Sequence, residues 1–294
     1  MSGPLRVGLV GAGPWATMVH APLLAAGPET VLTAVWARRA EAARALAADH
    51  GAEPAGSVDE LFDHCDVVAF AVPPDVQAEL ASRAAVAGKA LLLEKPIAGD
   101  LAGAEQLVAA VERAGVASLI VLSWRYADAV RAFLDDAGRF EALGATGRFL
   151  GGGLVRGPFQ TPWRLDRGPL LDLGPHVIDL LDAAAGTVVG VRASGDLRRF
   201  VALQLDHGSG VTSSVVLSGH TPINPGRAGV ELFGPSGVLQ VDCASAASEA
   251  SFATLRRELA EVVAGAPHPL DVRRGLHLQR WLHEAERQLL AAAR

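Results

Sequence analysis

The sequence predicts an α/β protein in which a doubly wound parallel sheet is followed by an α+β domain with a largely antiparallel, open sheet. In residues 1–122, short apolar runs alternate with amphipathic stretches of helical length, which is typical of repeated β-α-β units. In residues 123–294, several strand-like runs follow one another with hairpin turns between them. We therefore predict a first domain over residues 1–122 and a second over residues 123–294.

The first domain is expected to contain five strands. Their apolar runs show no polar alternation, as in strands that are covered on both faces by helices. These predicted strands are Leu5–Val10, Val31–Trp36, Val67–Val72, Ala90–Leu93 and Ser118–Leu122. Helical segments are expected up to Ala26 and over Arg39–Ala48, Val76–Ala87 and Leu101–Ala114.

The second domain includes a polar, glycine-rich passage from Asp135 to Gly168, in which we predict no regular element. A helix over Pro175–Ala185 follows. The strands predicted after it are Val188–Ala193, Phe200–Leu205, Val211–Leu217, Val230–Phe233 and Val238–Val241. Two closing helices are predicted because Phe252–Val263 and Leu278–Leu289 each place apolar side chains on one helical face.

Composition excludes several classes of function. The net charge is −6, and the 26 Lys and Arg residues are scattered, so we expect no nucleic acid partner. No run of about 18 apolar residues predicts a membrane span. The two cysteines, Cys65 and Cys243, are far apart and the histidines lack ligand spacing, so we expect no metal site and a reducing, cytoplasmic location.

Residues 11–16 (GAGPWA) match the pattern G-x-G-x-x-G/A between the first strand and the first helix. Gly11 permits the tight turn, Gly13 removes a side chain where a pyrophosphate approaches, and Ala16 allows close helix packing. The pattern predicts a dinucleotide on a Rossmann domain, with Pro14 and Trp15 also at the cofactor and the pyrophosphate on the helix N-terminus.

The end of the second strand favours NADP over NAD. NAD-binding domains carry there an acidic residue that binds the ribose 2′-hydroxyl. This sequence has Ala37, Arg38 and Arg39 instead, and guanidinium groups pair well with a 2′-phosphate. The alternative is that both arginines are merely solvated at a helix start.

The ends of the third and fourth strands are expected to complete the cofactor site. Val72 and Pro73 lie at the end of the third strand, and Glu94 and Lys95 follow the fourth. Ligands of open α/β sheets bind at the carboxyl ends of the strands, where these residues lie.

Two short motifs carry the candidate chemistry. Glu94-Lys95-Pro96 follows the fourth strand, and Asp172-Leu-Gly-Pro-His176 leads into the helix predicted from Pro175. Because proline is tolerated in a first helical turn, Asp172 and His176 are expected around that helix start and on one side of it.

With the glycine loop, these motifs occur in an order that resembles the glucose–fructose oxidoreductase / inositol dehydrogenase (Gfo/Idh/MocA) family, essentially from end to end. The resemblance implies hydride transfer between a nicotinamide and a carbinol carbon of a sugar or cyclitol. It implies Lys95, Asp172 and His176 as catalytic residues and a cis Lys95–Pro96 bond. It also implies a homodimer or homotetramer that forms through the sheet of the second domain.

The chemistry assigns a role to each catalytic candidate. A histidine side chain ordinarily titrates near neutrality, so His176 suits a general base or, in reverse, an acid. Lys95 would stabilise charge on the substrate oxygen, and Asp172 would position the substrate hydroxyl or the imidazole. Taken singly, these residues could also be a surface lysine, a helix cap and a solvated histidine.

Arg125 and Trp163 are the further candidates for substrate contact, beside Lys95, Asp172 and His176. Both could equally be ordinary structural residues. Gln77 stands where the family usually has a histidine.

Two alternative functions remain open on the same scaffold. One is a redox-neutral reaction with tightly held NAD(P). The other is a sensor of cofactor or sugar that has no catalytic activity.

Overall fold

The computed structural model describes residues 3–292, which pack into two compact units. The first unit runs to Val121 and also includes Phe252–Gln279. The second comprises Leu122–Ser251 and the chain from Arg280. The division predicted from the sequence kept residues 123–294 together, whereas here one C-terminal segment groups with the first unit. No helix among residues 3–292 has both the length and the apolar character needed to cross a membrane.

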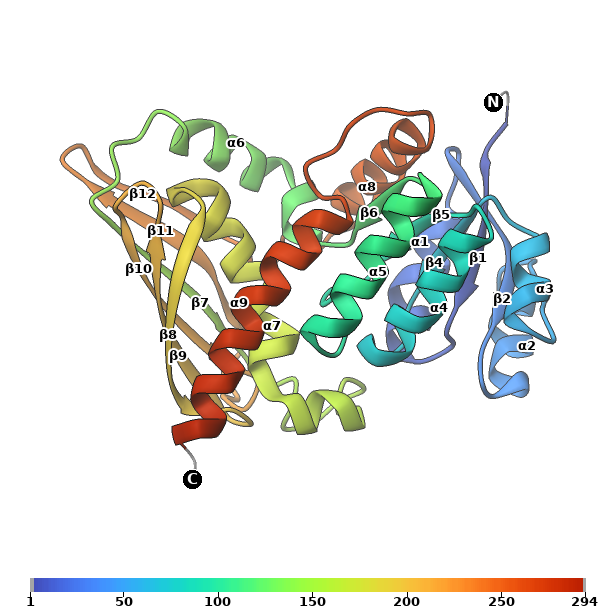
Figure 1. Cartoon of the computed structure of the whole chain (residues 1–294), viewed down its shortest axis with the longest axis horizontal. Helices are drawn as coiled ribbons and strands as arrows, with labels where there is room; N and C mark the ends of the chain where they lie inside the picture. Colours follow the sequence, from blue (N-terminus) through green and yellow to red (C-terminus); the bar gives the residue numbers. More distant parts are fainter. Residues whose placement is uncertain (1–2, 293–294) are drawn as a thin grey trace. The chain divides into compact units, whose positions relative to one another are not determined.

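The first unit is built on a six-stranded sheet in which every neighbouring pair is parallel (Figure 1). Its order, β3-β2-β1-β4-β5-β6, changes direction between β1 and β4. The strands are β1 (Leu5–Val10), β2 (Thr30–Trp36), β3 (Glu53–Pro54), β4 (Val67–Phe70), β5 (Ala90–Leu93) and β6 (Ser118–Ile120). This is the predicted doubly wound fold, with the short β3 added at one edge.

Helices connect these strands. They are η1 (Ala16–His20, a π-helical segment), α1 (Ala21–Ala25), α2 (Ala40–Asp49), α3 (Val58–Asp63), α4 (Pro74–Val86) and α5 (Leu101–Ala114). Side chains cap two of them, since Ser57 accepts a hydrogen bond from the Glu60 N–H and Asp100 accepts one from the Gly103 N–H. Two helices, α8 (Glu249–Val263) and α9 (Val272–Ala292), close the chain.

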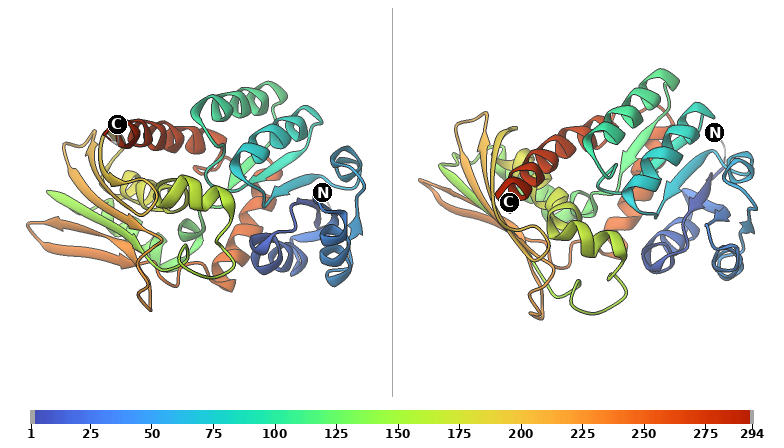
Figure 2. Two further views of the ribbon diagram at one scale, coloured as in Figure 1. Left: turned by 90° about the horizontal axis from the view of Figure 1, so that it is seen from below. Right: turned by 60° about the horizontal axis from the view of Figure 1, so that its bottom comes forward.

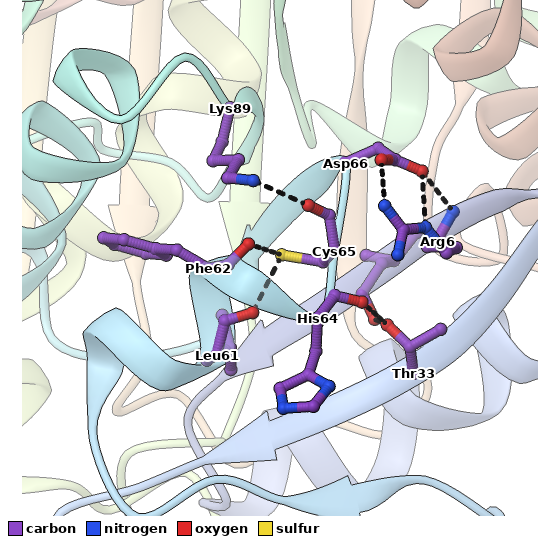
Figure 3. A network of polar contacts seen from close by, with 9 residues as sticks. Arg6, Thr33, Leu61, Phe62, His64, Cys65, Asp66 and Lys89 are labelled. Atoms are coloured by element: carbon purple, nitrogen blue, oxygen red, sulfur yellow. Dashed lines mark hydrogen bonds and ion pairs between the residues drawn. The ribbon is translucent and has the colours of Figure 1, made fainter.

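The strand β1 and the helix α3 approach closely at Gly8, beside the polar contacts of Arg6, Cys65 and Asp66 that Figure 3 shows. A Cβ added to Gly8 would lie 2.6 Å from Leu61 Cδ2 and 2.9 Å from Cys65 Sγ, so only glycine fits there. The buried Cys65 thiol donates to the Leu61 carbonyl at 3.2 Å. Arg6 and Asp66 form an exposed ion pair beside it at 2.6 Å.

The second unit contains a six-stranded sheet of order β12-β11-β7-β10-β9-β8. Its strands are β7 (Gly144–Leu150), β8 (Val188–Asp196), β9 (Phe200–His207), β10 (Thr212–Ser218), β11 (Arg227–Gly234) and β12 (Gly237–Asp242). All neighbours are antiparallel except β7 and β10, which are parallel. The prediction of a largely antiparallel sheet is therefore confirmed.

The helices of this unit are η2 (Ser123–Tyr126, a 3₁₀ turn), α6 (Asp128–Ala137) and α7 (Pro162–Ala185). In Figures 1 and 2, α7 lies along one face of the sheet, and no helix of the described residues covers the opposite face. Gly147 of β7 allows this packing, because a Cβ there would lie 2.5 Å from Val177 Cγ1 of α7.

Two expectations for this unit are wrong. The passage from Asp135 to Gly168 is not irregular, since it contains β7 and the first turns of α7. The helix does not begin at Pro175 either. Gly168 breaks α7 with φ 64° and ψ −164°, and Pro169 starts the second helical stretch, so Pro175 lies inside it.

Candidate active site

The glycine loop follows β1 and has one crowded side and one open side. Gly11 has φ +124°, and a Cβ there would lie 2.5 Å from the Ala71 carbonyl oxygen, so a side chain is excluded. A Cβ on Gly13, in contrast, would meet no atom within 4 Å. Ala16 is fully buried behind the loop. The loop therefore keeps free space at the position expected for a pyrophosphate.

The chain becomes helical directly after Gly13, whose carbonyl accepts a hydrogen bond from the Thr17 N–H at 3.0 Å. The first N–H groups of a helix have no intrahelical partner and attract anions. Together with the open side of Gly13, this start fits the pyrophosphate of a dinucleotide, for which Pro14 and Trp15 would also line the loop.

The end of β2 lies beside the loop, because the Gly11 N–H donates to the Trp36 carbonyl at 2.8 Å. Ala37, Arg38 and Arg39 follow, and both arginine side chains are exposed. Arg39 is the N-cap residue of α2 but makes no side-chain capping bond. The guanidinium groups are thus at the edge of the candidate cofactor site.

Val72 and Pro73 follow β4 on the other side of the loop. The Val72 Cγ1 atom would lie 3.2 Å from a Cβ on Gly11, so the two residues are neighbours. Pro73 is the N-cap residue of α4. The predicted cofactor residues after β1 and β4 therefore lie together.

Glu94 closes β5 and ties the lysine motif to the glycine loop. Its Oε1 accepts hydrogen bonds from Trp15 Nε1 at 2.7 Å and from His20 Nε2 at 2.8 Å. Its Oε2 accepts one from the Lys95 N–H at 3.2 Å. The Lys95–Pro96 peptide is cis, which confirms that expectation. Sequence reasoning missed His20, which is completely buried and whose only signal was its place in the helix after the loop.

Gln77, in α4, holds the same segment from the other side. Its Oε1 accepts from the Glu94 N–H at 2.8 Å, and its Nε2 donates to the carbonyls of Glu94, Pro96 and Ile97 at 2.8, 3.3 and 3.1 Å. Gln77 is fully buried. The backbone around Lys95 is therefore fixed by a side chain that cannot change its charge.

In the second unit, Asp172 and His176 lie one turn apart inside α7 and are 9% and 8% exposed. The His176 ring stacks on Trp124 with centroids 5.1 Å apart and planes at 29°. Phe149, from the end of β7, is 6.2 Å from the same imidazole. Aromatic rings from η2 and β7 thus fix the orientation of the histidine.

Asp172 is held by an arginine that itself lies on aromatic rings. Arg164 Nε donates to Asp172 Oδ1 at 3.1 Å, and both side chains are mostly buried. The guanidinium carbon lies 4.5 Å from the centre of the Trp163 ring and 5.7 Å from that of Phe159. Trp163, a predicted substrate residue, therefore supports Arg164.

Arg125, the other predicted substrate residue, forms an ion pair with Asp179 at 3.0 Å. Asp179 is 1% exposed, so this arginine neutralises a buried carboxylate. Lys95 comes from the first unit, whereas Asp172, His176, Arg125 and Trp163 come from the second.

Comparison with known proteins shows which family the sequence matches. A sequence profile described as "Oxidoreductase family, NAD-binding Rossmann fold" (GFO_IDH_MocA) matches residues 5–122. A dTDP-3,4-didehydro-2,6-dideoxy-alpha-D-glucose 3-reductase from Streptomyces violaceoruber is 31% identical over 267 residues, which cover 81% of this chain and 72% of the relative. A D-apiose dehydrogenase from Paraburkholderia graminis is 33% identical over 61% of this chain and 49% of its own length.

The fold agrees with these relatives. The crystal structure of the WlbA dehydrogenase from Bordetella pertussis, in complex with NADH and UDP-GlcNAcA, superimposes with a TM-score of 0.85 at 21% identity. The alignment covers 98% of this chain and 97% of WlbA. The chain belongs to the Gfo/Idh/MocA family of oxidoreductases with an NAD-binding Rossmann fold.

Proposed function

We propose that this protein is an NADP-dependent oxidoreductase that interconverts a hydroxyl and a ketone on a sugar, cyclitol or similar polyol. The observation that carries the proposal is the joint presence of the glycine loop, Lys95 on a fixed backbone, and the Asp172–His176 pair on one turn of α7. The relatives are a reductase and a dehydrogenase of sugars, which supports this substrate class.

A nicotinamide cofactor held by the glycine loop and the end of β2 would supply the acceptor for the hydride of the carbinol carbon in the oxidative direction. His176 takes the hydroxyl proton as the carbonyl forms, and returns a proton in the reductive direction. Lys95 donates a hydrogen bond to the same oxygen and stabilises its negative charge. Asp172, kept in place by Arg164, orients the substrate hydroxyl or the imidazole.

The preference for NADP rests on the end of β2. Arg38 and Arg39 are exposed there, and residues 36–40 contain no carboxylate that could receive a ribose 2′-hydroxyl. A guanidinium group binds a phosphate through two parallel hydrogen bonds. We therefore propose that Arg38 binds the 2′-phosphate.

Titration of the purified protein with NADPH and NADH, followed by fluorescence, tests the cofactor assignment. We expect tight NADPH binding, weakened about tenfold or more in Arg38→Ala because a charge-assisted contact is lost. NADH affinity should not change. The control is Arg44→Ala, which removes an exposed arginine from α2, the helix that follows Arg38 and Arg39. If Arg38→Ala weakened the affinity for NADPH and NADH equally, the 2′-phosphate contact would be refuted. If the wild type bound neither cofactor, the enzyme proposal would be refuted.

Turnover of sugars and ketones by a Lys95→Ala variant tests the catalytic assignment. We expect turnover to fall far more than the affinity for NADPH, because the stabilisation of the substrate oxygen is lost. Unchanged turnover would refute the role of Lys95. A cofactor that survives purification and is not reduced by any polyol would instead indicate the redox-neutral alternative.

We further propose that two or more copies associate through the open face of the second unit's sheet, and that the protein works in the cytoplasm. The first proposal is supported by a sheet face that no helix of residues 3–292 covers (Figure 2). The second is supported by the free thiols of Cys65 and Cys243, as expected in a reducing compartment.

A further inference from the structure

A single carboxylate joins two segments that lie on either side of β4. Glu94 follows β5, whereas Trp15 belongs to the glycine loop after β1, and the sheet order places β4 between these two strands. The hydrogen bond from Trp15 Nε1 to Glu94 Oε1, at 2.7 Å, therefore spans the carboxyl end of β4. The strand order changes direction at this point, which is where open α/β sheets bind their ligands.

The Glu94 carboxylate is the meeting point of three donors. Glu94 is only 8% exposed. Beside the indole of Trp15, its Oε1 accepts from His20 Nε2 at 2.8 Å, and its Oε2 accepts from the Lys95 N–H at 3.2 Å. The donors come from the glycine loop, from η1 and from the segment after β5. Because a buried carboxylate needs its hydrogen bonds, the three segments are fixed relative to one another through this one side chain.

The His20 side chain serves this carboxylate alone among residues 3–292. His20 is completely buried, and its second ring nitrogen, Nδ1, has no hydrogen-bond partner in that range. A buried polar atom without a partner lowers the free energy of unfolding, so an apolar side chain would suit a purely structural position better. What the imidazole adds to packing is therefore the hydrogen bond that it donates to Glu94.

The backbone that carries His20 is unusual as well. The Ala21 N–H donates to the Ala16 carbonyl five residues earlier, so the turn from the glycine loop to His20 is π-helical. Turns of this kind are rare in proteins and are frequent at functional sites. The backbone thus gives a second, independent reason to assign a function to His20.

We propose that His20 is a positioning residue of the cofactor site. By holding Glu94, it fixes the indole of Trp15 at the glycine loop and the backbone of Lys95 before a dinucleotide arrives. Binding is then tighter, because less of the site has to be ordered when the cofactor binds. The inference rests on the function proposed above, since it concerns the same cofactor and the same lysine.

Fluorescence titration of the full-length protein with NADPH tests this role in two variants. We expect the Kd to rise about tenfold in His20→Leu, because Glu94 loses a charge-assisted hydrogen bond and no longer fixes the loops. Turnover of any sugar or ketone that the wild type accepts should fall too. His20→Gln supplies an amide donor in place of Nε2 and should recover most of both losses. His64→Leu, at an exposed position of the same unit, is the control and should bind NADPH as the wild type does.

The variant Trp15→Phe tests the same connection without changing the buried histidine. It keeps an aromatic ring at a half-buried position and removes only the Nε1 donor, so we expect it to weaken NADPH binding as well. If both residues act through Glu94, the loss of affinity in His20→Leu/Trp15→Phe should be smaller than the sum of the two single losses. Losses that add in full would show that the residues act separately, and would overturn the proposal.

The proposal is also overturned if His20→Leu or Trp15→Phe binds NADPH with the affinity of the wild type, or if His20→Gln binds as weakly as His20→Leu. The wild type separates this inference from the proposed function. A wild type that binds no NADPH contradicts the proposed enzyme. A wild type that binds NADPH no better than the variants contradicts only the role of His20.

Discussion

At the scale of single residues, Gln77 illustrates how one buried amide group can fix the loop that carries the catalytic candidate Lys95. Its two polar atoms make four hydrogen bonds to the backbone of residues 94–97, which surrounds Lys95. A glutamine can accept at one atom and donate at the other without any change of charge. We infer that the position of Lys95 therefore does not depend on the ionisation of its support.

The variant Gln77→Leu removes all four hydrogen bonds and leaves the Glu94 N–H and three carbonyls buried without this partner. Unsatisfied buried polar groups cost about 1–3 kcal/mol of unfolding free energy. We also expect kcat to fall because Lys95 loses its fixed backbone. Urea unfolding and steady-state kinetics measure the two effects. Gln106→Leu, at an exposed position of α5, is the control. Wild-type kcat in Gln77→Leu would show that the loop is held by other groups.

At the scale of elements, the contact between β7 and α7 positions His176. Gly147 faces Val177, the residue next to His176, and the two elements could not approach so closely with a side chain between them. The sequence did not predict β7, since its GATGRFL run contains two glycines and lacks the apolar run used to identify strands. The strand forms because β10 and β11 pair with it on both sides, which is information that a local pattern does not contain.

Gly147→Ala is expected to push α7 away from β7. The new methyl group would lie 2.5 Å from Val177 Cγ1, and overpacking of this kind costs about 1–3 kcal/mol. We expect lower stability in thermal unfolding together with lower kcat, because His176 moves with the helix. Gly144→Ala is a matched control on the same strand, since its Cβ would meet only the Thr212 carbonyl oxygen at 3.8 Å. If both variants behaved alike, the close approach at Gly147 would not control the helix.

At the scale of the whole molecule, the two buried thiols, Cys65 and Cys243, are expected to make the folded protein less stable as the pH becomes alkaline. Burial raises the pKa of Cys65 from 9.0 to about 11 and that of Cys243 to about 12. In the unfolded chain both thiols ionise near their ordinary pKa, whereas in the folded chain they stay protonated. Stability is therefore complete below about pH 9 and decreases as the pH rises from there through the folded-state pKa values.

Urea unfolding on both sides of pH 9 measures this dependence. The buried Cys65 is expected to contribute on the order of 2 kcal/mol to the decrease, at about 1.4 kcal/mol for each pKa unit. Cys65→Ala is less stable overall because a buried group is removed, but its stability should decrease less between pH 9 and 11. Parallel pH profiles for the variant and the wild type would contradict the assignment of this decrease to Cys65.

The sequence predicted the architecture more completely than the details of the site. The strands β1 and β5 and the helix α5 have the predicted bounds, because their apolar periodicity and flanking glycine or proline residues are local signals. Ion pairs such as Arg164–Asp172 and Arg125–Asp179, and the contacts of Gln77 and His20, were not predictable. They join residues whose proximity is set by tertiary packing, and a polar residue type does not reveal its partner.

The open face of the second sheet carries two ion pairs. Arg148 pairs with Glu231 at 3.0 Å, and Arg192 pairs with Asp206 at 3.0 Å. A second copy could cover these four side chains without leaving any of them unpaired, which would otherwise be costly. Val216 of the central strand β10 lies on the same side, since its neighbours Val215 and Leu217 are buried on the side that faces α7. We therefore expect Val216 to be near the middle of the proposed interface.

The variant Val216→Arg tests the proposed assembly. A new charge without a partner at this position would be buried twice in a symmetric dimer, so we expect dissociation to smaller species. Sedimentation velocity over a range of protein concentrations measures the change. Val86→Arg adds the same charge at a 78% exposed position of α4 and should leave the assembly intact. If the wild type sediments as a monomer at all concentrations, or if Val216→Arg assembles as the wild type does, then the open face is not the interface. In that case the ion pairs across β7, β11, β8 and β9 serve only to keep an exposed sheet soluble.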